Sequence, residues 1–282
     1  MTTGTTPARD DRDIFRLAPT LDAPTLEMIA TRLEFRGTDP GYLRLSQAYF
    51  DQLPLAPATR ILAVGCGTGI EVRALKRRTQ TTAELVGVDH SPALIAAAER
   101  LTREEGLAER VRFQVGDAHH LDFDEASFDI VLLHTLLSHV DDPLQVLREA
   151  RRVARSGGTI AVFDGDYASL TFGYPDPLRA RAIEEALLKV IVANPRLMRD
   201  LPRLLREAGL ELISGHGAVY TNIGSGDFFA NMAEAFGGVL ARTGLLPPAA
   251  VEEWQRYQRR SLEEQTFFGA SNYYTYIARR PR

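Results

Sequence analysis

The stretch Ile61-Leu-Ala-Val-Gly-Cys-Gly-Thr-Gly69 decides the fold of this chain, because it joins an apolar strand directly to a glycine-rich turn. Such a strand brings the backbone to one edge of a parallel sheet, and glycine lets it bend sharply and approach a ligand without a Cβ in the way. The apolar spacing of Ile70, Val72 and Leu75 predicts that the turn opens onto a helix, whose first N–H groups lack partners within the helix. The sequence therefore predicts a nucleotide-type site at this edge.

The spacing of the glycines distinguishes between nucleotide cofactors. A dinucleotide fingerprint requires Gly-x-Gly-x-x-Gly, but when the pattern starts at Gly65 and Gly67 its third position holds Ile70. This weakens the alternative of an NAD-dependent oxidoreductase. No Gly-Lys-Ser or Gly-Lys-Thr closes the turn, which excludes a P-loop.

Further apolar segments predict strands that end at functional positions. Glu84 to Asp89 ends in a carboxylate that can accept both hydroxyls of a ribose. The next segments are residues 111–115, which lead into Gly116-Asp117, then residues 127–134 and residues 159–163. Because each strand leads into a helix or loop, the sequence predicts an α/β fold with a Rossmann-like, doubly wound sheet.

The remainder of the chain predicts helices around this sheet and two further strands. A disordered tail is expected at residues 1–12, and helical periodicity predicts an N-terminal lid at residues 13–55. The main domain is expected at residues 56–282, with helical insertions at about 170–200 and 225–263. The sixth and seventh strands are expected at residues 210–223 and 267–279.

Composition narrows the classes of partner. The 282 residues carry a net charge of −4, and the 33 basic residues are dispersed, so we expect no nucleic-acid substrate. A single cysteine, Cys66, leaves no disulfide framework and no zinc cluster. Without a bilayer-length apolar stretch or a secretory signal, the sequence predicts a cytoplasmic protein that does not associate with membranes.

Val64-Gly-Cys-Gly-Thr-Gly69, followed in order by Asp89 and Gly116-Asp117, resembles the first motifs of the class I methyltransferases that depend on S-adenosyl-L-methionine (SAM). More narrowly, the chain resembles the small-molecule branch that includes the ubiquinone- and menaquinone-biosynthesis type (methyltransferase type 11). The resemblance covers about residues 25–280 and is strongest from 60 to 165. It implies a seven-stranded, mostly parallel sheet with an antiparallel last strand and helical cap insertions.

The resemblance also implies which residues bind SAM. The glycine turn would contact the methionine part, Asp89 the ribose and Asp117 the adenine amino group. Arg36 is interpreted either as a ligand of the methionine carboxylate or as a surface arginine. The implied cofactor-binding residues are Arg36, Gly65, Cys66, Gly67, Gly69, Asp89, His90, Asp117, Ala118 and His134.

Methyl transfer from a sulfonium requires alignment of the acceptor, exclusion of water and, for some acceptors, removal of a proton. Histidine suits proton removal, which makes His139 and His134, both after the fourth strand, candidate bases. His139 is expected at the start of the next helix, where it could equally be structural, and His134 could instead be a neighbour of the cofactor. Asp164 is a third candidate, either as a base or as a residue that caps the turn, and no matched set of metal ligands is evident.

Aromatic side chains in the insertions and the late strands predict a hydrophobic acceptor pocket. The candidate substrate residues are Tyr167, Phe172, Tyr220, Phe229 and Tyr273, with ordinary core packing as the alternative for many of them. The adjacent His119 and His120 are interpreted as solvated loop residues.

The sequence thus predicts an enzyme that transfers a methyl group from SAM to an oxygen, nitrogen or carbon of a small, hydrophobic metabolite of secondary metabolism. One alternative is a SAM-binding protein that catalyses a different reaction or serves as a non-catalytic partner subunit. The expected partner is the methyl acceptor, and a homodimer is left open.

Overall fold

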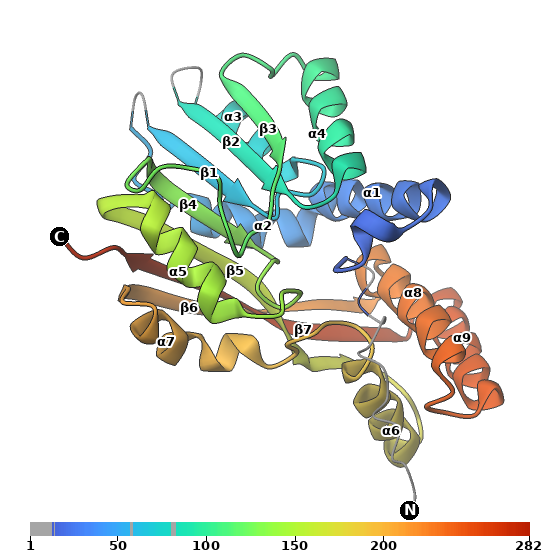
Figure 1. Ribbon diagram of the computed structural model, residues 1–282. Helices are drawn as coiled ribbons and strands as arrows, with labels where there is room; N and C mark the ends of the chain where they lie inside the picture. Colours follow the sequence, from blue (N-terminus) through green and yellow to red (C-terminus); the bar gives the residue numbers. More distant parts are fainter. Residues whose placement is uncertain (1–12, 14, 57–58, 80–82) are drawn as a thin grey trace, which may run out of the picture.

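The computed structural model describes residues 13, 15–56, 59–79 and 83–282, so the predicted tail at residues 1–12 lies outside the described residues. Within the described ranges, seven strands form one sheet in the order β3-β2-β1-β4-β5-β7-β6, with helices on both faces (Figure 1). The strands are β1 (Arg60–Val64), β2 (Glu84–Asp89), β3 (Val111–Val115), β4 (Phe128–His134), β5 (Ala154–Phe172), β6 (Glu211–Gly224) and β7 (Phe267–Arg279). The helices are η1 (Ala18–Thr20), α1 (Ala23–Thr38), α2 (Pro40–Phe50), α3 (Ile70–Thr79), α4 (Pro92–Glu104), α5 (Pro143–Val153), α6 (Pro177–Leu188), α7 (Leu197–Glu207), α8 (Asp227–Thr243) and α9 (Pro248–Glu263).

The direction of the strands confirms the predicted fold class. The neighbouring strands from β3 to β5 all pair in parallel, whereas β7 pairs antiparallel with both β5 and β6. The carboxyl ends of β1, β2 and β4 therefore meet at one edge of the sheet, which is where open α/β sheets bind ligands.

Alternating side chains of the central strands explain the layers. Ile61 and Ala63 of β1 belong to a buried cluster with Tyr42 of α2 and Val72 of α3. Leu62 and Val64 of β1 point to the opposite face and belong to a second buried cluster, which contains residues of α5 and α7. Because successive residues of a strand point to opposite faces, an unbroken apolar strand is what a sheet covered on both sides requires.

Strand β5 is longer than predicted. The sequence places its end near residue 163, but it continues to Phe172 by pairing with β7. The register shifts between Asp166 and Thr171, so Tyr167 and its neighbours leave the regular ladder. The prediction was wrong because the polar residues after Phe163 do not look like a strand, and only the partner strand β7 keeps them extended.

A cap of helices covers the far end of the β5–β7 pair (Figure 1). Helices α8 and α9 pack against each other and against β7, and α6 packs against α8 and β5. Phe172, at the end of β5, contacts Trp254 and Phe229, with ring centroids 5.4 and 6.4 Å apart. The cap therefore has an aromatic core of its own that is continuous with the sheet.

The two N-terminal helices lie on different parts of the fold, and α2 contacts strands β5 and β6. Asp22 caps α1 by accepting the backbone N–H of Thr25 at 2.9 Å, and Asp39 caps α2 by accepting that of Tyr42 at 2.8 Å. Helix α1 packs on α3 and α4, as Figure 1 shows, whereas α2 places Tyr42 and Tyr49 in the main core. This arrangement brings the N-terminal segment next to the carboxyl ends of the parallel strands.

Candidate active site

The glycine turn after β1 has the backbone conformation that only glycine adopts easily. Gly65 and Gly69 have φ angles of 67° and 79°, in the left-handed region. A Cβ on Gly65 would lie 2.6 Å from a methyl carbon of Leu136, and one on Gly69 would lie 2.8 Å from the Phe113 ring. Helix α3 begins at Ile70, so its first N–H groups lie beside the turn, as predicted.

Asp89, at the end of β2, is a buried carboxylate fixed by backbone donors. One oxygen accepts the N–H of Gly67 at 2.9 Å, and the other accepts the N–H of Ser91 at 2.9 Å. The side chain of His90 also contacts Asp89, with Nδ1 3.2 Å from Oδ1. Each carboxylate oxygen can accept further hydrogen bonds, so the group is oriented in advance and retains acceptor capacity.

The turn and Asp89 border a cavity of about 470 Å³, which we name the first cavity. This volume lies in the usual range for small-molecule sites. All of the predicted cofactor residues border it except Gly69. Residues that the sequence analysis did not single out also border it, including Phe15, Arg16, Leu33, Glu71, Leu136 and Asp141.

A loop after β3 forms part of the wall of the first cavity. Asp117 accepts the backbone N–H of His119 at 2.8 Å, and its Oδ1 lies 2.7 Å from Nδ1 of the same residue. Burial acts to raise the pKa of Asp117, but the contacts with His119 lower it by more. Both histidines lie in the loop, as predicted: the side chain of His120 is 82% exposed, whereas that of His119 is 23% exposed and borders the cavity.

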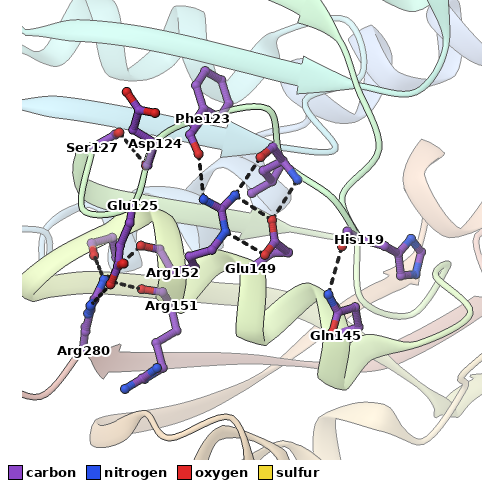
Figure 2. A network of polar contacts seen from close by, with 12 residues as sticks. His119, Phe123, Asp124, Glu125, Ser127, Gln145, Glu149, Arg151, Arg152 and Arg280 are labelled. Atoms are coloured by element: carbon purple, nitrogen blue, oxygen red, sulfur yellow. Dashed lines mark hydrogen bonds and ion pairs between the residues drawn. The ribbon is translucent and has the colours of Figure 1, made fainter.

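Polar contacts tie this loop to α5, as Figure 2 shows. Gln145 donates to the carbonyl of His119 at 3.1 Å, and Arg152 donates to the carbonyl of Phe123 at 2.7 Å. Glu149 accepts from Arg152 at 2.8 Å and so holds the guanidinium in place. The adenine side of the predicted site is therefore anchored to a helix of the sheet core.

Arg36, at the end of α1, brings a positive charge to the first cavity. Its guanidinium carbon lies 5.2 Å from the centre of the Tyr42 ring. Burial alone would lower its pKa, but Tyr42 and Glu71 raise it above the ordinary value, so the group stays charged. Among the described residues no carboxylate lies within ion-pair distance of Arg36, and its buried Nε has no hydrogen-bond partner.

His134 ends β4 inside a buried polar cluster. Its Nδ1 lies 2.8 Å from the hydroxyl of Tyr49, and its Nε2 lies 2.8 Å from the hydroxyl of Tyr42 and 3.0 Å from a carboxylate oxygen of Glu71. Burial and the charge of Arg36 hold the pKa of His134 well below its usual range. Both ring nitrogens are thus engaged by protein groups, which favours a structural part in the cavity wall over the predicted proton transfer.

His139 borders the first cavity from the turn after β4 and not from the start of a helix, because α5 begins only at Pro143. Its Nδ1 lies 2.7 Å from Oδ2 of Asp13, and its ring centroid lies 5.0 Å from that of Phe15. Among the described residues none bonds the other ring nitrogen, Nε2. Of the candidate bases, His139 therefore has the geometry that agrees best with proton removal.

Asp164 is fully buried and does not border the first cavity. Its oxygens accept the backbone N–H of Ser138 at 3.2 Å and of Gly165 at 2.8 Å. Burial raises the pKa of Asp164, although His139 and these hydrogen bonds act in the opposite direction. The geometry favours the alternative in which Asp164 fixes the turn that carries His139.

The predicted substrate residues are distributed over three places, and none borders the first cavity. Phe172 and Phe229 lie in the core of the cap. Tyr220 donates to Asp39 at the start of α2. Tyr167 and Tyr273 lie nearer the cavity: the Tyr167 ring centroid is 6.3 Å from that of His139, and Tyr273 stacks on Phe163.

A second cavity, of about 540 Å³, adjoins the first and shares Arg16, Val140 and Asp141 with it. Its far side comes from the end of α6 and the residues after it: Leu188, Lys189, Val190, Val192, Ala193 and Asn194. Asp13 also borders it, so the Asp13–His139 contact lies between the two cavities. The sequence analysis did not predict it, because its walls come from segments that are far apart in the chain.

Comparisons with known proteins agree with this geometry. The sequence model of a family described as a methyltransferase domain matches residues 62–162, which contain the glycine turn, Asp89, Asp117 and His134. The chain is 32% identical over 236 residues to an uncharacterised 37.1 kDa protein in transposon TN4556 of Streptomyces fradiae, which covers 81% of this chain and 64% of that protein. It is 31% identical over 169 residues to the 27-O-demethylrifamycin SV methyltransferase of Amycolatopsis mediterranei, which covers 60% of each.

The chain thus spans 64% and 60% of the lengths of these two relatives. Among solved structures it is similar to the 4+2 cyclase SpnF, with a TM-score of 0.57, 23% identity and coverage of 85% of this chain and 82% of that chain. At this identity the likeness concerns the fold alone. Residues 62–162 of the chain thus match the methyltransferase-domain family, and the strand order and the cavity at the glycine turn agree with that match.

Proposed function

We propose that the protein transfers a methyl group from SAM to an oxygen, nitrogen or carbon atom of a small, hydrophobic metabolite. One observation carries the proposal: the first cavity combines a preoriented carboxylate, Asp89, with a guanidinium, Arg36, that forms no ion pair with any described carboxylate. SAM presents a ribose diol and a free carboxylate on the same molecule, which matches these two groups. A nicotinamide dinucleotide carries no carboxylate and needs a pyrophosphate site that the glycine spacing does not provide.

The residues of the first cavity fit the parts of SAM in order. Gly65 and Gly67 present backbone without a Cβ to the methionine part, and Arg36 binds its carboxylate as a charge-assisted pair. Asp89 accepts the ribose hydroxyls, and the Asp117–Ala118 backbone and side chain contact adenine. The remaining predicted cofactor residues, Cys66, His90 and His134, form the walls between these groups.

When bound, SAM supplies a sulfonium methyl group that is already reactive. The chain then has to align the acceptor, exclude water and accept a proton where the acceptor carries one. His139 is placed for the last step, because it borders the first cavity with Nε2 unoccupied by protein groups. Phe15 and Arg16, from the predicted lid, also border the cavity and would shield its contents from part of the solvent.

We assign the second cavity to the approach of the acceptor. It reaches the contact between Asp13 and His139, and it combines apolar walls from residues 188–193 with the polar groups of Lys189 and Asn194. Ala193→Trp is expected to raise the KM of the acceptor and to leave the affinity for S-adenosylhomocysteine unchanged. The rifamycin-related name of one relative supports an acceptor from secondary metabolism.

Calorimetric titration of the full chain with SAM, S-adenosylhomocysteine and NADH tests the proposal. We expect both adenosyl ligands to bind and NADH not to bind, and we then expect transfer of labelled methyl from SAM to members of an acceptor library. Failure of both adenosyl ligands to bind would contradict the proposal. Binding of SAM with no transfer to any acceptor would favour the alternative of a SAM-binding protein with another reaction or no reaction.

Location and assembly remain predictions. Across the described part of the chain, no helix combines the length and the apolar character needed to cross a membrane. The expected cytoplasmic location, the absence of a nucleic-acid partner and the open question of a homodimer are best addressed by cell fractionation and by light scattering of the purified protein.

A further inference from the structure

The segment before α1 borders the first cavity and contacts three other residues of its wall. Asp13 contacts His139, and Arg16 forms an ion pair with Asp141 at 2.7 Å. His90 Nε2 lies 3.3 Å from the carbonyl of Arg16. We name the described residues of this part of the chain, Asp13 and residues 15–21, the N-terminal strap.

Asp13 is held in a fixed orientation at the start of the strap. Its Oδ1 accepts the backbone N–H of Phe15 at 3.1 Å and of Arg16 at 3.4 Å, which closes a turn. Its Oδ2 lies 2.7 Å from Nδ1 of His139. Asp13 is 5% exposed and the side chain of His139 is 11% exposed, so water hardly competes for this contact.

The contact determines the state of the imidazole. An ionised carboxylate only accepts hydrogen bonds, so Nδ1 of His139 has to carry the proton. In the neutral ring the lone pair then lies on Nε2, for which no described residue is a partner. Asp13 therefore orients the ring and leaves its basic nitrogen available.

The groups around His139 come from several elements. Asp13 of the strap, Asp164 of β5 and Arg36 of α1 act on its charge, and Tyr167 lies beside its ring. Burial and Arg36 act to lower the pKa of His139, but Asp13, with support from Asp164, raises it above the ordinary value. A base that is buried yet still accepts a proton readily is what proton removal near neutral pH requires.

We propose that Asp13 is a positioning residue: the N-terminal strap holds its carboxylate against Nδ1 of His139 and so orients the base. The inference rests on the proposed function. For a hydroxyl acceptor, the O–H bond breaks and its proton passes to Nε2. An electron pair of the acceptor oxygen forms the bond to the methyl carbon, and the electrons of the S–C bond stay on sulfur. The imidazolium that results is stabilised by the carboxylate of Asp13.

The strap also offers a matched control. The ion pair between Arg16 and Asp141 fastens the same segment, but it lies outside the contact between Asp13 and His139. Asp141→Asn removes this second tie and leaves the carboxylate at His139 in place. A role of Asp13 that consists only of fastening the strap predicts equal effects of the two variants on the state of His139.

Nuclear magnetic resonance of the full chain with ¹⁵N-labelled histidine and saturating S-adenosylhomocysteine reads the state of His139 without an acceptor, and His139→Gln assigns its signals. In the wild type we expect the neutral ring to carry its proton on Nδ1. Asp13→Asn should lower the measured pKa of His139, and Asp13→Ala should in addition release the tautomer. Asp141→Asn should keep both wild-type properties. A titration curve and tautomer of His139 that are the same in both Asp13 variants as in the wild type would overturn the proposal.

Turnover provides the second readout once an acceptor is known. Asp13→Asn should lower kcat/KM roughly 10- to 100-fold, a part of the 10²- to 10⁴-fold that a general base supplies, and should move the acidic limb of the pH profile. Unchanged turnover and an unchanged pH profile would overturn the proposal. Calorimetry on the same samples separates this proposal from the proposed function. If the wild-type protein does not bind S-adenosylhomocysteine, the proposed function is contradicted. The resonances of His139 test its contact with Asp13 independently of that result.

Discussion

The sheet wall of the first cavity is held by contacts between residues that are near in the sequence, whereas the wall from the N-terminal segments is held across most of the chain. Gly67 and Asp89 are 22 residues apart, but Tyr42 and His134 are 92 apart and Asp13 and His139 are 126 apart. The first kind of wall uses backbone donors at strand ends, and the second uses side-chain pairs. The comparison shows that local contacts form the sheet wall, whereas the wall from the N-terminal segments, which includes Arg36, forms only when distant parts of the chain pack together.

The largest effect is expected for Asp89→Ala, which removes the carboxylate of the sheet wall. Affinity for SAM and S-adenosylhomocysteine should fall by about 100-fold or more, because hydrogen bonds to a charged group contribute about 1.5–3 kcal/mol each and 1.4 kcal/mol is a factor of ten. Calorimetry measures the change, with the exposed Asp122→Ala as the control that should bind normally. An affinity of Asp89→Ala within a few-fold of wild type would remove Asp89 from the ribose site.

Arg36→Met tests whether the N-terminal wall also contributes to cofactor binding, through the proposed contact of Arg36 with the carboxylate. Affinity for S-adenosylhomocysteine should fall by roughly 10- to 100-fold, because a charge-assisted pair with the carboxylate is lost. 5′-Methylthioadenosine, which keeps adenine and ribose but lacks the amino acid group, should bind the variant and the wild type equally. Equal losses for both ligands would instead assign Arg36 a structural part.

Tyr49→Phe and Tyr42→Phe test the buried cluster around His134 by urea unfolding. Tyr49→Phe should destabilise the protein by about 1–3 kcal/mol, since it leaves Nδ1 of the buried ring without a partner among the described residues. Tyr42→Phe should have a smaller effect, because Glu71 remains 3.0 Å from Nε2. Tyr257→Phe, in α9, serves as the control with little expected change. A larger loss for Tyr42→Phe would contradict this description of the cluster.

The smallest expected effect is the pH dependence of the contact between Asp13 and His139. Because folding raises the pKa of His139, its stabilisation is fully present below the unfolded value of about 6.5 and is lost as the pH rises through the folded value. His134 has the opposite dependence, since folding lowers its pKa. The measurement is therefore the difference in unfolding free energy between wild type and Asp13→Asn at acidic and alkaline pH, in which His134 cancels. A difference that grows with pH would be the wrong sign.

The same comparison explains how much the sequence predicts. The strands, the glycine turn and Asp89 are predictable because apolar runs and glycines act locally, and the order of these motifs agrees with one sheet edge. The N-terminal strap and His119 are not predictable in this way. Asp13 and Arg16 look like ordinary surface residues until the fold places them beside His139 and Asp141.

The residues that would line the acceptor pocket were also not predictable from the sequence. Aromatic composition suggested pocket residues, but Phe172 and Phe229 fill the core of the cap, because packing of the α8–α9 pair on the β5–β7 ribbon needs large side chains there. The second cavity is formed between the strap and residues 188–194, which have no shared pattern in the sequence. Side-chain type alone does not distinguish a lining aromatic residue from a buried one.

Cys66 gives the turn after β1 a chemical reporter. It is the single cysteine of the sequence, it is buried, and it borders the first cavity. Burial raises the pKa of its thiol, and the negative charge of Asp89 raises it further. The folded protein therefore presents no thiolate to a reagent. The rate at which a disulfide reagent labels the native protein therefore measures how often this turn becomes accessible, and S-adenosylhomocysteine should slow that labelling without any engineered probe.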